Sequence, residues 1–290
     1  MYKEVAIDPR CMADMEYYNL VKQHFGYDKG RYISAEVKVW TKEAMEYVKK
    51  SDLSDVKLQS VKNYLNKIGR SKGSNEFLLT KDRKGSVATC WNDWVDKQKT
   101  IRVFSCIISD AKGVDKINID DINEGCSLWD IPASTSIKKN PHDIISVLQP
   151  LIKLSQELVL IDPFFTLSRN PVLEELFKEI QNTFLTSLRI VTSIDSTDVK
   201  RIYNSEYEKL NTKKIAFQWI KVPEKFFHDR YFISNVGALG AGQGFLKQIE
   251  KGAPSDRLNL HRISQDEASE ILGDLEKSIE TEKTIIQLTV

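Results

Sequence analysis

The second half of the chain alternates short apolar runs with segments of helical periodicity, and this pattern constrains the fold more than any other feature. Two of the segments begin with a capping asparagine followed by proline, at Asn140-Pro141 and Asn170-Pro171. A third begins with the capping-box spacing of Ser264 and Glu267. Strands that alternate with helices predict an α/β fold in which a layered mixed sheet is flanked by helices.

The first half of the chain contains the same kinds of segment in a less regular order. We expect strands at residues 4–8, 32–40, 76–80 and 100–109, helices at 41–50 (with Thr41 as N-cap) and 56–73, and a turn-rich segment at 81–99. Residues 113–140 are polar and irregular, which indicates a boundary. The chain is thus predicted to have a smaller N-terminal α/β region, 1–140, that binds substrate or a partner, and a C-terminal domain, 141–290.

Composition restricts the classes of protein to be considered. The 290 residues are 41% hydrophobic and 29% charged, and the net charge is only +1, so a nucleic-acid surface would have to come from local clusters of basic residues. The four cysteines have no Cys-x-x-Cys spacing, and we therefore expect reduced thiols, no metal and no cofactor. No signal-peptide pattern and no run approaching ~20 apolar residues occurs, so a cytoplasmic protein without a membrane span is expected.

One local cluster of basic residues lies on the helix predicted at 56–73. It contains Lys57, Lys62, Lys67, Arg70 and Lys72, and no acidic residue interrupts it. The cluster is interpreted either as a nucleic-acid-binding surface or as the solvated face of a helix. Trp91 and Trp94 leave a similar choice between base stacking and a place in the core.

A histidine and an arginine two residues apart are the strongest candidates for chemistry. His228 and Arg230 fall in a strand-like stretch, where side chains two residues apart point to the same side, and a glycine-rich segment follows. An imidazole can attack phosphorus, a guanidinium can hold two phosphate oxygens, and amides of a glycine-rich turn can bind the same anion. The alternative is a structural pair, with Arg230 bound to Asp229 or Glu224 and His228 in the core.

This stretch resembles the signature of the phospholipase D superfamily, which reads His-x-Lys, four residues, Asp, six residues and Gly-Ser-x-Asn. His228 takes the position of the histidine, Arg230 that of the lysine and Asn235 that of the aspartate. Gly242 matches the glycine, whereas Gln243 and Phe245 stand in place of the serine and the asparagine. The version with His-Asp-Arg before a glycine-rich strand pair is similar to the domain at the C-terminus of MIT-domain proteins, and the resemblance covers about residues 141–290.

The resemblance implies a phospholipase D-like fold for residues 141–290 and a hydrolase, a metal-independent phosphodiesterase that acts as a nuclease. His228 would be nucleophile or general acid, Arg230 the phosphate clamp and Asn235 a supporting donor. The phosphate would also contact the glycine-rich turn at Gly240, Gly242, Gln243 and Gly244. Single-motif relatives pair two histidines across a two-fold axis, so a homodimer is implied.

The same resemblance implies a setting in bacterial antiviral defence against phage, beside an ATPase or helicase partner. The alternative function is a catalytically inactive module that binds phosphate, nucleic acid or anionic lipid as a subunit of a defence complex. Asp162, at the end of the apolar run 157–162, could contact a ligand at the carboxyl end of a strand, but we expect a turn or capping residue.

Overall fold

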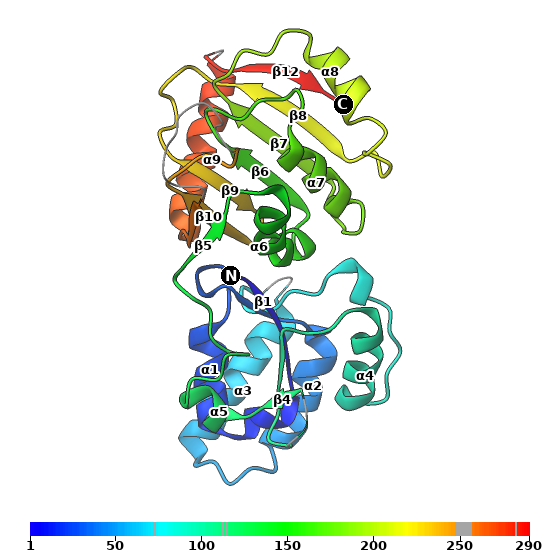
Figure 1. Ribbon diagram of the computed structural model, residues 1–290. Coiled ribbons are helices and arrows are strands. Elements are labelled where there is room, and N and C mark those ends of the chain that lie inside the picture. Colours follow the sequence, from blue (N-terminus) through cyan, green and yellow to red (C-terminus); the bar gives the residue numbers. More distant parts are fainter. Residues whose placement is uncertain (72–73, 112, 114, 247–256, 282) are drawn as a thin grey trace. The chain divides into compact units, whose positions relative to one another are not determined.

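The computed structural model describes residues 1–71, 74–111, 113, 115–246, 257–281 and 283–290. The chain divides into two compact units, Tyr2–Ile131 and Pro132–Val290, each with its own sheet (Figure 1). The division comes earlier than the boundary predicted at residue 140. The reason is that β5 (Ser134–Lys138) pairs with β11 (Arg257–Arg262) and so belongs to the C-terminal sheet.

The N-terminal unit is built on a parallel sheet of strand order β2-β1-β3-β4. The strands are β1 (Lys3–Ile7), β2 (Arg31–Ile33), β3 (Cys106–Ile108) and β4 (Lys116–Ile117). The helices are α1 (Met15–His24), α2 (Val37–Val48), α3 (Asp55–Arg70), α4 (Trp91–Ile101) and α5 (Ile119–Asn123). Val5, Ala6 and Ile7 of the inner strand β1 are fully buried, as is typical of parallel strands covered on both faces.

The structure corrects several element predictions in this unit. The strand predicted at 32–40 ends at Ile33, because Trp40, Thr41 and Ala44 are buried together on one face of α2. Thr41 therefore lies inside the helix, and Glu36 is its N-cap. Residues 76–80 form no strand and contribute one bridge, from Phe77 to Ile33.

The segment at 81–99, predicted as turns, contains α4, whose buried residues Trp91, Trp94, Val95 and Gln98 follow helical spacing. Of the strand predicted at 100–109, only β3 forms, since α4 continues to Ile101.

The C-terminal unit contains a mixed sheet of order β12-β8-β7-β6-β9-β10-β11-β5. Its other strands are β6 (Glu157–Ile161), β7 (Ser187–Thr192), β8 (Ala216–Lys221), β9 (Arg230–Ser234), β10 (Gly237–Ala241) and β12 (Ile285–Thr289). Its helices are α6 (Pro141–Leu154), α7 (Pro171–Ile180), α8 (Val199–Glu206) and α9 (Gln265–Glu280). Strands β6, β7 and β8 are parallel, and the remaining pairs are antiparallel.

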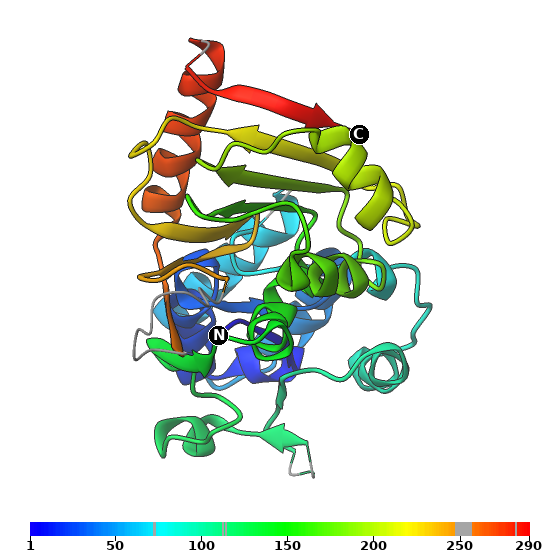
Figure 2. The ribbon, with the colours of Figure 1, turned by 45° about the horizontal axis from the view of Figure 1, so that its top comes forward.

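Helices cover both faces of this sheet (Figures 1 and 2). On one face, Phe177 of α7 and Tyr203 of α8 pack on Phe217 of β8, with ring centroids 5.4 and 5.2 Å from that ring. On the other face, Arg189 of β7 forms an ion pair with Glu276 of α9. The predicted layered mixed sheet flanked by helices is confirmed.

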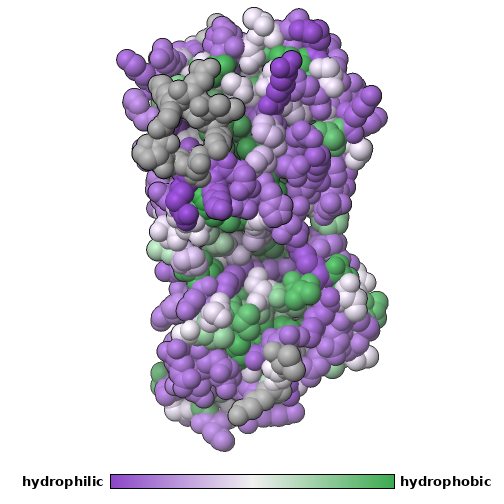
Figure 3. All heavy atoms as spheres, viewed as in Figure 1, coloured by the Kyte–Doolittle hydropathy of each residue, from purple (hydrophilic) through white to green (hydrophobic). Residues whose placement is uncertain are grey.

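The helix starts that the sequence predicted for this unit also form. Asn140 Oδ1 accepts the Asp143 amide at 2.9 Å, and Asn170 Oδ1 accepts the amides of Val172 and Leu173 at 3.0 Å each. Ser264 Oγ accepts the Glu267 amide at 3.1 Å. The face of the molecule seen in Figure 3 is largely hydrophilic. Across the described ranges, every helix falls short of the length and apolar character that crossing a bilayer requires.

Candidate anion-binding site

Arg230 and Asp162 meet at one end of the C-terminal sheet. Arg230 opens β9 and Asp162 directly follows β6, and the antiparallel pair Ile161–Tyr231 brings the two residues side by side. Arg230 Nε lies 3.9 Å from Asp162 Oδ1, with side chains 18% and 1% exposed. A buried carboxylate thus faces a guanidinium that remains partly open to solvent.

Asp162 also binds two backbone amides. Its Oδ1 accepts the Phe164 amide at 3.0 Å and its Oδ2 accepts the Phe245 amide at 2.7 Å. Burial raises the pKa of Asp162, while the two amides and then Arg230 act in the opposite direction. Asp162 is therefore more than the turn residue that we expected, because it holds the loop after β10 next to Arg230.

The Arg230 guanidinium is held by weak and local contacts. Its Nη1 donates to the His228 carbonyl at 3.0 Å, and its Cζ lies 5.5 Å from the centroid of the half-exposed Phe164 ring. Its Nε has no hydrogen-bond partner among the described residues. The expected structural alternative, an ion pair with Asp229 or Glu224, does not form within the described part of the chain. Because the Nε is buried and lies 3.9 Å from Asp162 Oδ1, donors for an external anion would have to come from the terminal Nη groups of the partly exposed side chain.

His228 lies in the loop before β9 and is exposed to solvent. It is neither a core residue, as one alternative proposed, nor part of the strand. Its main chain is joined to Arg230 by the Nη1 hydrogen bond, and its imidazole is accessible. An accessible imidazole next to an arginine is suited to contact with a phosphate bound there.

The glycine-rich segment has two roles that the sequence did not separate. A Cβ on Gly240 would lie 2.6 Å from His261 Nε2, so this glycine makes room for an imidazole from the neighbouring strand. Gly240 pairs with Tyr231 and His261, so all three share the face opposite to Arg230. This corrects the prediction that Gly240 belongs to the phosphate site.

Gly242, Gln243 and Gly244 lie at the Arg230 end of the sheet, because the preceding Ala241 pairs with Arg230. A Cβ on Gly244 would lie 3.1 Å from Asp162 Oδ2, whereas Gly242 faces open space. The Phe245 amide that follows is bound to Asp162 and not directed to an external anion. Gly242 is therefore the loop residue best placed to meet a ligand.

Asn235 lies at the opposite end of β9 from Arg230. Its Oδ1 accepts the amides of Gln156 and Glu157 at 2.9 and 3.3 Å, and it sits in the turn between β9 and β10. A five-residue strand separates the two side chains, so the prediction that Asn235 supports the anion site is corrected. Asn235 matches the aspartate of the signature in sequence position, but in the structure it belongs to the turn of the β9–β10 hairpin.

Lys139 is a residue that the sequence prediction missed. It lies close enough to Asp162 to lower the pKa of that carboxyl, and it follows β5 directly. Its neighbourhood could not be foreseen because β5 joins the sheet through pairs with a strand more than a hundred residues later. Lys139 gives this end of the sheet a second cation.

The predicted basic cluster belongs to α3 of the N-terminal unit. Lys57, Lys67 and Arg70 are exposed and Lys62 is half-buried, while Lys72 lies outside the described residues. Successive residues of a helix are rotated by about 100°, so the side chains of Lys62 and Lys67 point about 140° apart. The cations are therefore spread over the exposed side of α3. Both interpretations of the cluster, a nucleic-acid surface and a solvated face, stay open.

No family profile and no curated protein matches the sequence. The chain is similar to the solved structure of Nuc from Salmonella typhimurium, a phospholipase D family member, at 13% identity and a TM-score of 0.34, over 51% of this chain and 93% of that one. It is also similar to TrmBL2, an archaeal chromatin protein with a novel mode of DNA binding, at 10% identity and a TM-score of 0.33. That match covers 56% of this chain and 57% of TrmBL2, less than two thirds of its length. Similarity at this level assigns neither a family nor a chemistry to the chain.

Proposed function

We propose that the C-terminal unit binds phosphodiesters at Arg230 and hydrolyses them through His228, as a metal-independent nuclease of the phospholipase D type. The observation that supports the proposal is a partly exposed guanidinium two residues from an exposed imidazole, with Arg230 Nη1 donating to the main-chain carbonyl of His228 at 3.0 Å. Asp162 supports it by orienting Arg230 from the buried side. The same proposal places the unit in the branch of the superfamily that is similar to the C-terminal domain of MIT-domain proteins.

The chemistry proceeds in two steps. The neutral His228 imidazole attacks phosphorus, a nitrogen–phosphorus bond forms, and the bond to the leaving oxygen breaks. Water then attacks phosphorus, the nitrogen–phosphorus bond breaks, and the imidazole returns to its neutral form with release of a proton. Arg230 stabilises the non-bridging oxygens throughout, with Lys139 as a second cation nearby.

The leaving oxygen requires a proton in the first step. His261 sits on the opposite face of the sheet, so it is not the donor at the same site. We propose that a second copy of the chain supplies its own His228, in a homodimer. The nuclease would act in antiviral defence with an ATPase or helicase partner, and the basic residues of α3 would bind the nucleic acid.

The second candidate is a module that binds a phosphodiester without cleaving it. Asn235 is remote from Arg230 and Gly240 lies within the sheet, so two of the donors expected at the phosphate are missing. Binding through Arg230 needs neither of them.

A cleavage assay with purified protein, single-stranded DNA and RNA in EDTA tests the proposal. We expect cleavage that His228→Ala abolishes and that His142→Ala, which removes an exposed histidine of the same unit, leaves unchanged. Binding without cleavage, lost in Arg230→Ala, would establish the binding module instead. Cleavage that survives His228→Ala in a folded protein would refute the enzyme.

A further inference from the structure

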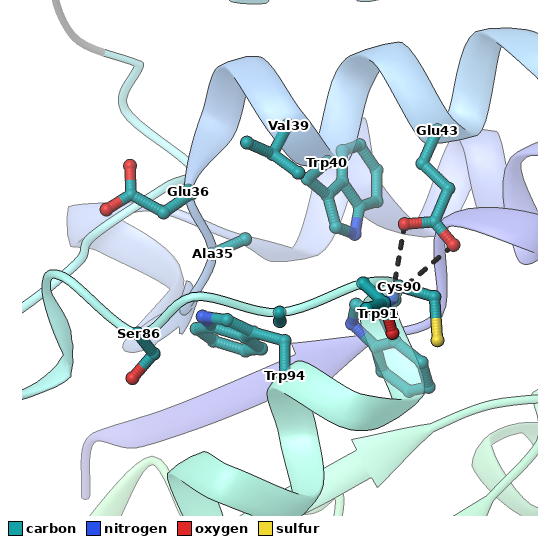
Figure 4. A pocket seen from close by; sticks show the side chains of 11 residues that line it. Ala35, Glu36, Val39, Trp40, Glu43, Ser86, Cys90, Trp91 and Trp94 are labelled. Carbon is teal, nitrogen blue, oxygen red and sulfur yellow. Dashed lines mark hydrogen bonds between the residues drawn. The ribbon is translucent and has the colours of Figure 1, made fainter.

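A cavity of about 110 Å³ lies in the N-terminal unit, between α2 and the chain that leads into α4 (Figure 4). Three tryptophans and two glutamates are among the residues that line it: Trp40, Trp91, Trp94, Glu36 and Glu43. The exposed thiol of Cys90 also lines it. None of these residues belongs to the anion site.

The cavity is at the carboxyl end of the parallel sheet. Trp40 Nε1 donates to the carbonyl of Ile7, the last residue of β1, at 2.7 Å. Ala35, another lining residue, follows β2 by two positions. Open parallel sheets commonly bind their ligands at this edge, where the loops after the strands converge.

The walls of the cavity are rich in aromatic rings. Figure 4 shows Trp40 on the α2 side, and Trp91 and Trp94 on the opposite side, from α4. Indole rings attract cations through their negative faces, and tryptophan is the strongest of the aromatic residues in this respect.

The charge of the cavity is negative. Glu36 and Glu43 line it, and no lysine or arginine does so among the described residues. Neither glutamate forms an ion pair within the described part of the chain. Glu43 is fixed by accepting the Trp91 amide, at 3.2 Å for its closer oxygen. Arg10, whose charge lowers the pKa of Glu43, is already bound by both oxygens of Asp8.

We propose that this cavity binds a small organic cation with a methylated ammonium group. Aromatic walls and carboxylates without a basic residue are the features that recognise such a group. At about 110 Å³ the cavity is smaller than the cavity of about 150 Å³ that holds a benzene ring, so it would take the methylated ammonium head and leave the rest of the ligand outside. The proposal is independent of the function proposed for the C-terminal unit.

Calorimetric titration of the full chain with choline and with 3,3-dimethylbutan-1-ol, its neutral isostere, tests this inference. We expect choline to bind at least about tenfold more tightly than the alcohol. The double variant Glu36→Gln/Glu43→Gln should weaken choline by about tenfold and leave the alcohol unchanged. The side-chain amide introduced at position 43 keeps an oxygen for the Trp91 amide, and Glu46→Gln, an exposed change on the same helix, is the matched control.

A second readout uses the thiol at the cavity. In a Cys126→Ser background, Cys90 is the exposed cysteine, since Cys11 and Cys106 are buried. Choline should slow alkylation of Cys90. Nα-acetyl-trimethyllysine amide, titrated in parallel, distinguishes a methylated lysine side chain from a free small molecule, and tighter binding of either supports the site. Equal affinity for choline and the neutral alcohol, or no binding of any cation by the folded protein, would overturn the proposal.

Discussion

At the residue scale, the candidate anion site depends on the balance between Asp162 and an incoming phosphate. The buried carboxyl lies 3.9 Å from Arg230 Nε and competes with any anion for that guanidinium. Burial raises the pKa of Asp162, so its protonated form is more populated in the folded protein than in the unfolded chain. Protonation removes the competing charge.

Asp162→Asn should therefore raise the affinity for a short oligonucleotide. In the natural protein, affinity should fall as pH rises through the raised pKa of Asp162, because the carboxylate then forms beside Arg230. The phosphodiester itself does not titrate in this range. Asp162→Asn should weaken this pH dependence and bind about tenfold more tightly at pH 7.

Fluorescence anisotropy of a labelled oligonucleotide between pH 4 and 8 measures this effect. Asp229→Asn, an exposed change next to Arg230, should keep the pH dependence. Identical pH profiles for Asp162→Asn and the natural protein would show that Arg230 does not take part.

The sequence predicted the residues of this site unevenly. His228 and Arg230 could be singled out from their residue types and spacing, although only Arg230 lies in β9 and His228 precedes it in a loop. Asp162 and Lys139 could not, because β6 and β5 reach this end of the sheet through pairs with β9 and β11. Asn235 was placed wrongly because a linear motif does not separate the two ends of a strand.

At the scale of helices and strands, the sequence predicted helix starts reliably where a capping side chain accepts hydrogen bonds from the first backbone amides of the helix. Asn170 caps α7 with two amides, is buried, and donates from Nδ2 to the Thr166 carbonyl at 2.7 Å. Asn140 caps α6 with one amide and is half-buried. The prediction of a strand at 32–40 was wrong beyond Ile33. Burial of Trp40 on α2 outweighed the alternating pattern of apolar and polar residues.

Asn170→Ala should destabilise the protein by about 2 kcal/mol, the upper end for the loss of an N-cap. Asn140→Ala, the matched change, should cost about 1 kcal/mol because one amide is lost and water can replace part of the cap. Equilibrium urea denaturation of both variants measures the difference. Equal losses would mean that burial does not strengthen the cap at Asn170.

At the scale of the whole molecule, two sheets with separate cores carry two candidate sites. The parallel sheet of the N-terminal unit has the tryptophan-lined cavity at its carboxyl edge. The mixed sheet of the C-terminal unit has Arg230 and Asp162 at the carboxyl end of β6. The alternation of strands and helices predicted this architecture, whereas the strand order depends on long-range pairs that periodicity does not encode.

The central claim is that a phosphodiester bound at Arg230 contacts the His228 imidazole. Nuclear magnetic resonance of the histidine Cε1–H signals, during titration with a short phosphorothioate oligonucleotide, tests it most directly. We predict that the His228 signal shifts while that of His142 does not, and that Arg230→Ala abolishes the shift. A His228 signal that stays in place at saturating oligonucleotide, or that shifts equally in Arg230→Ala, would contradict the claim.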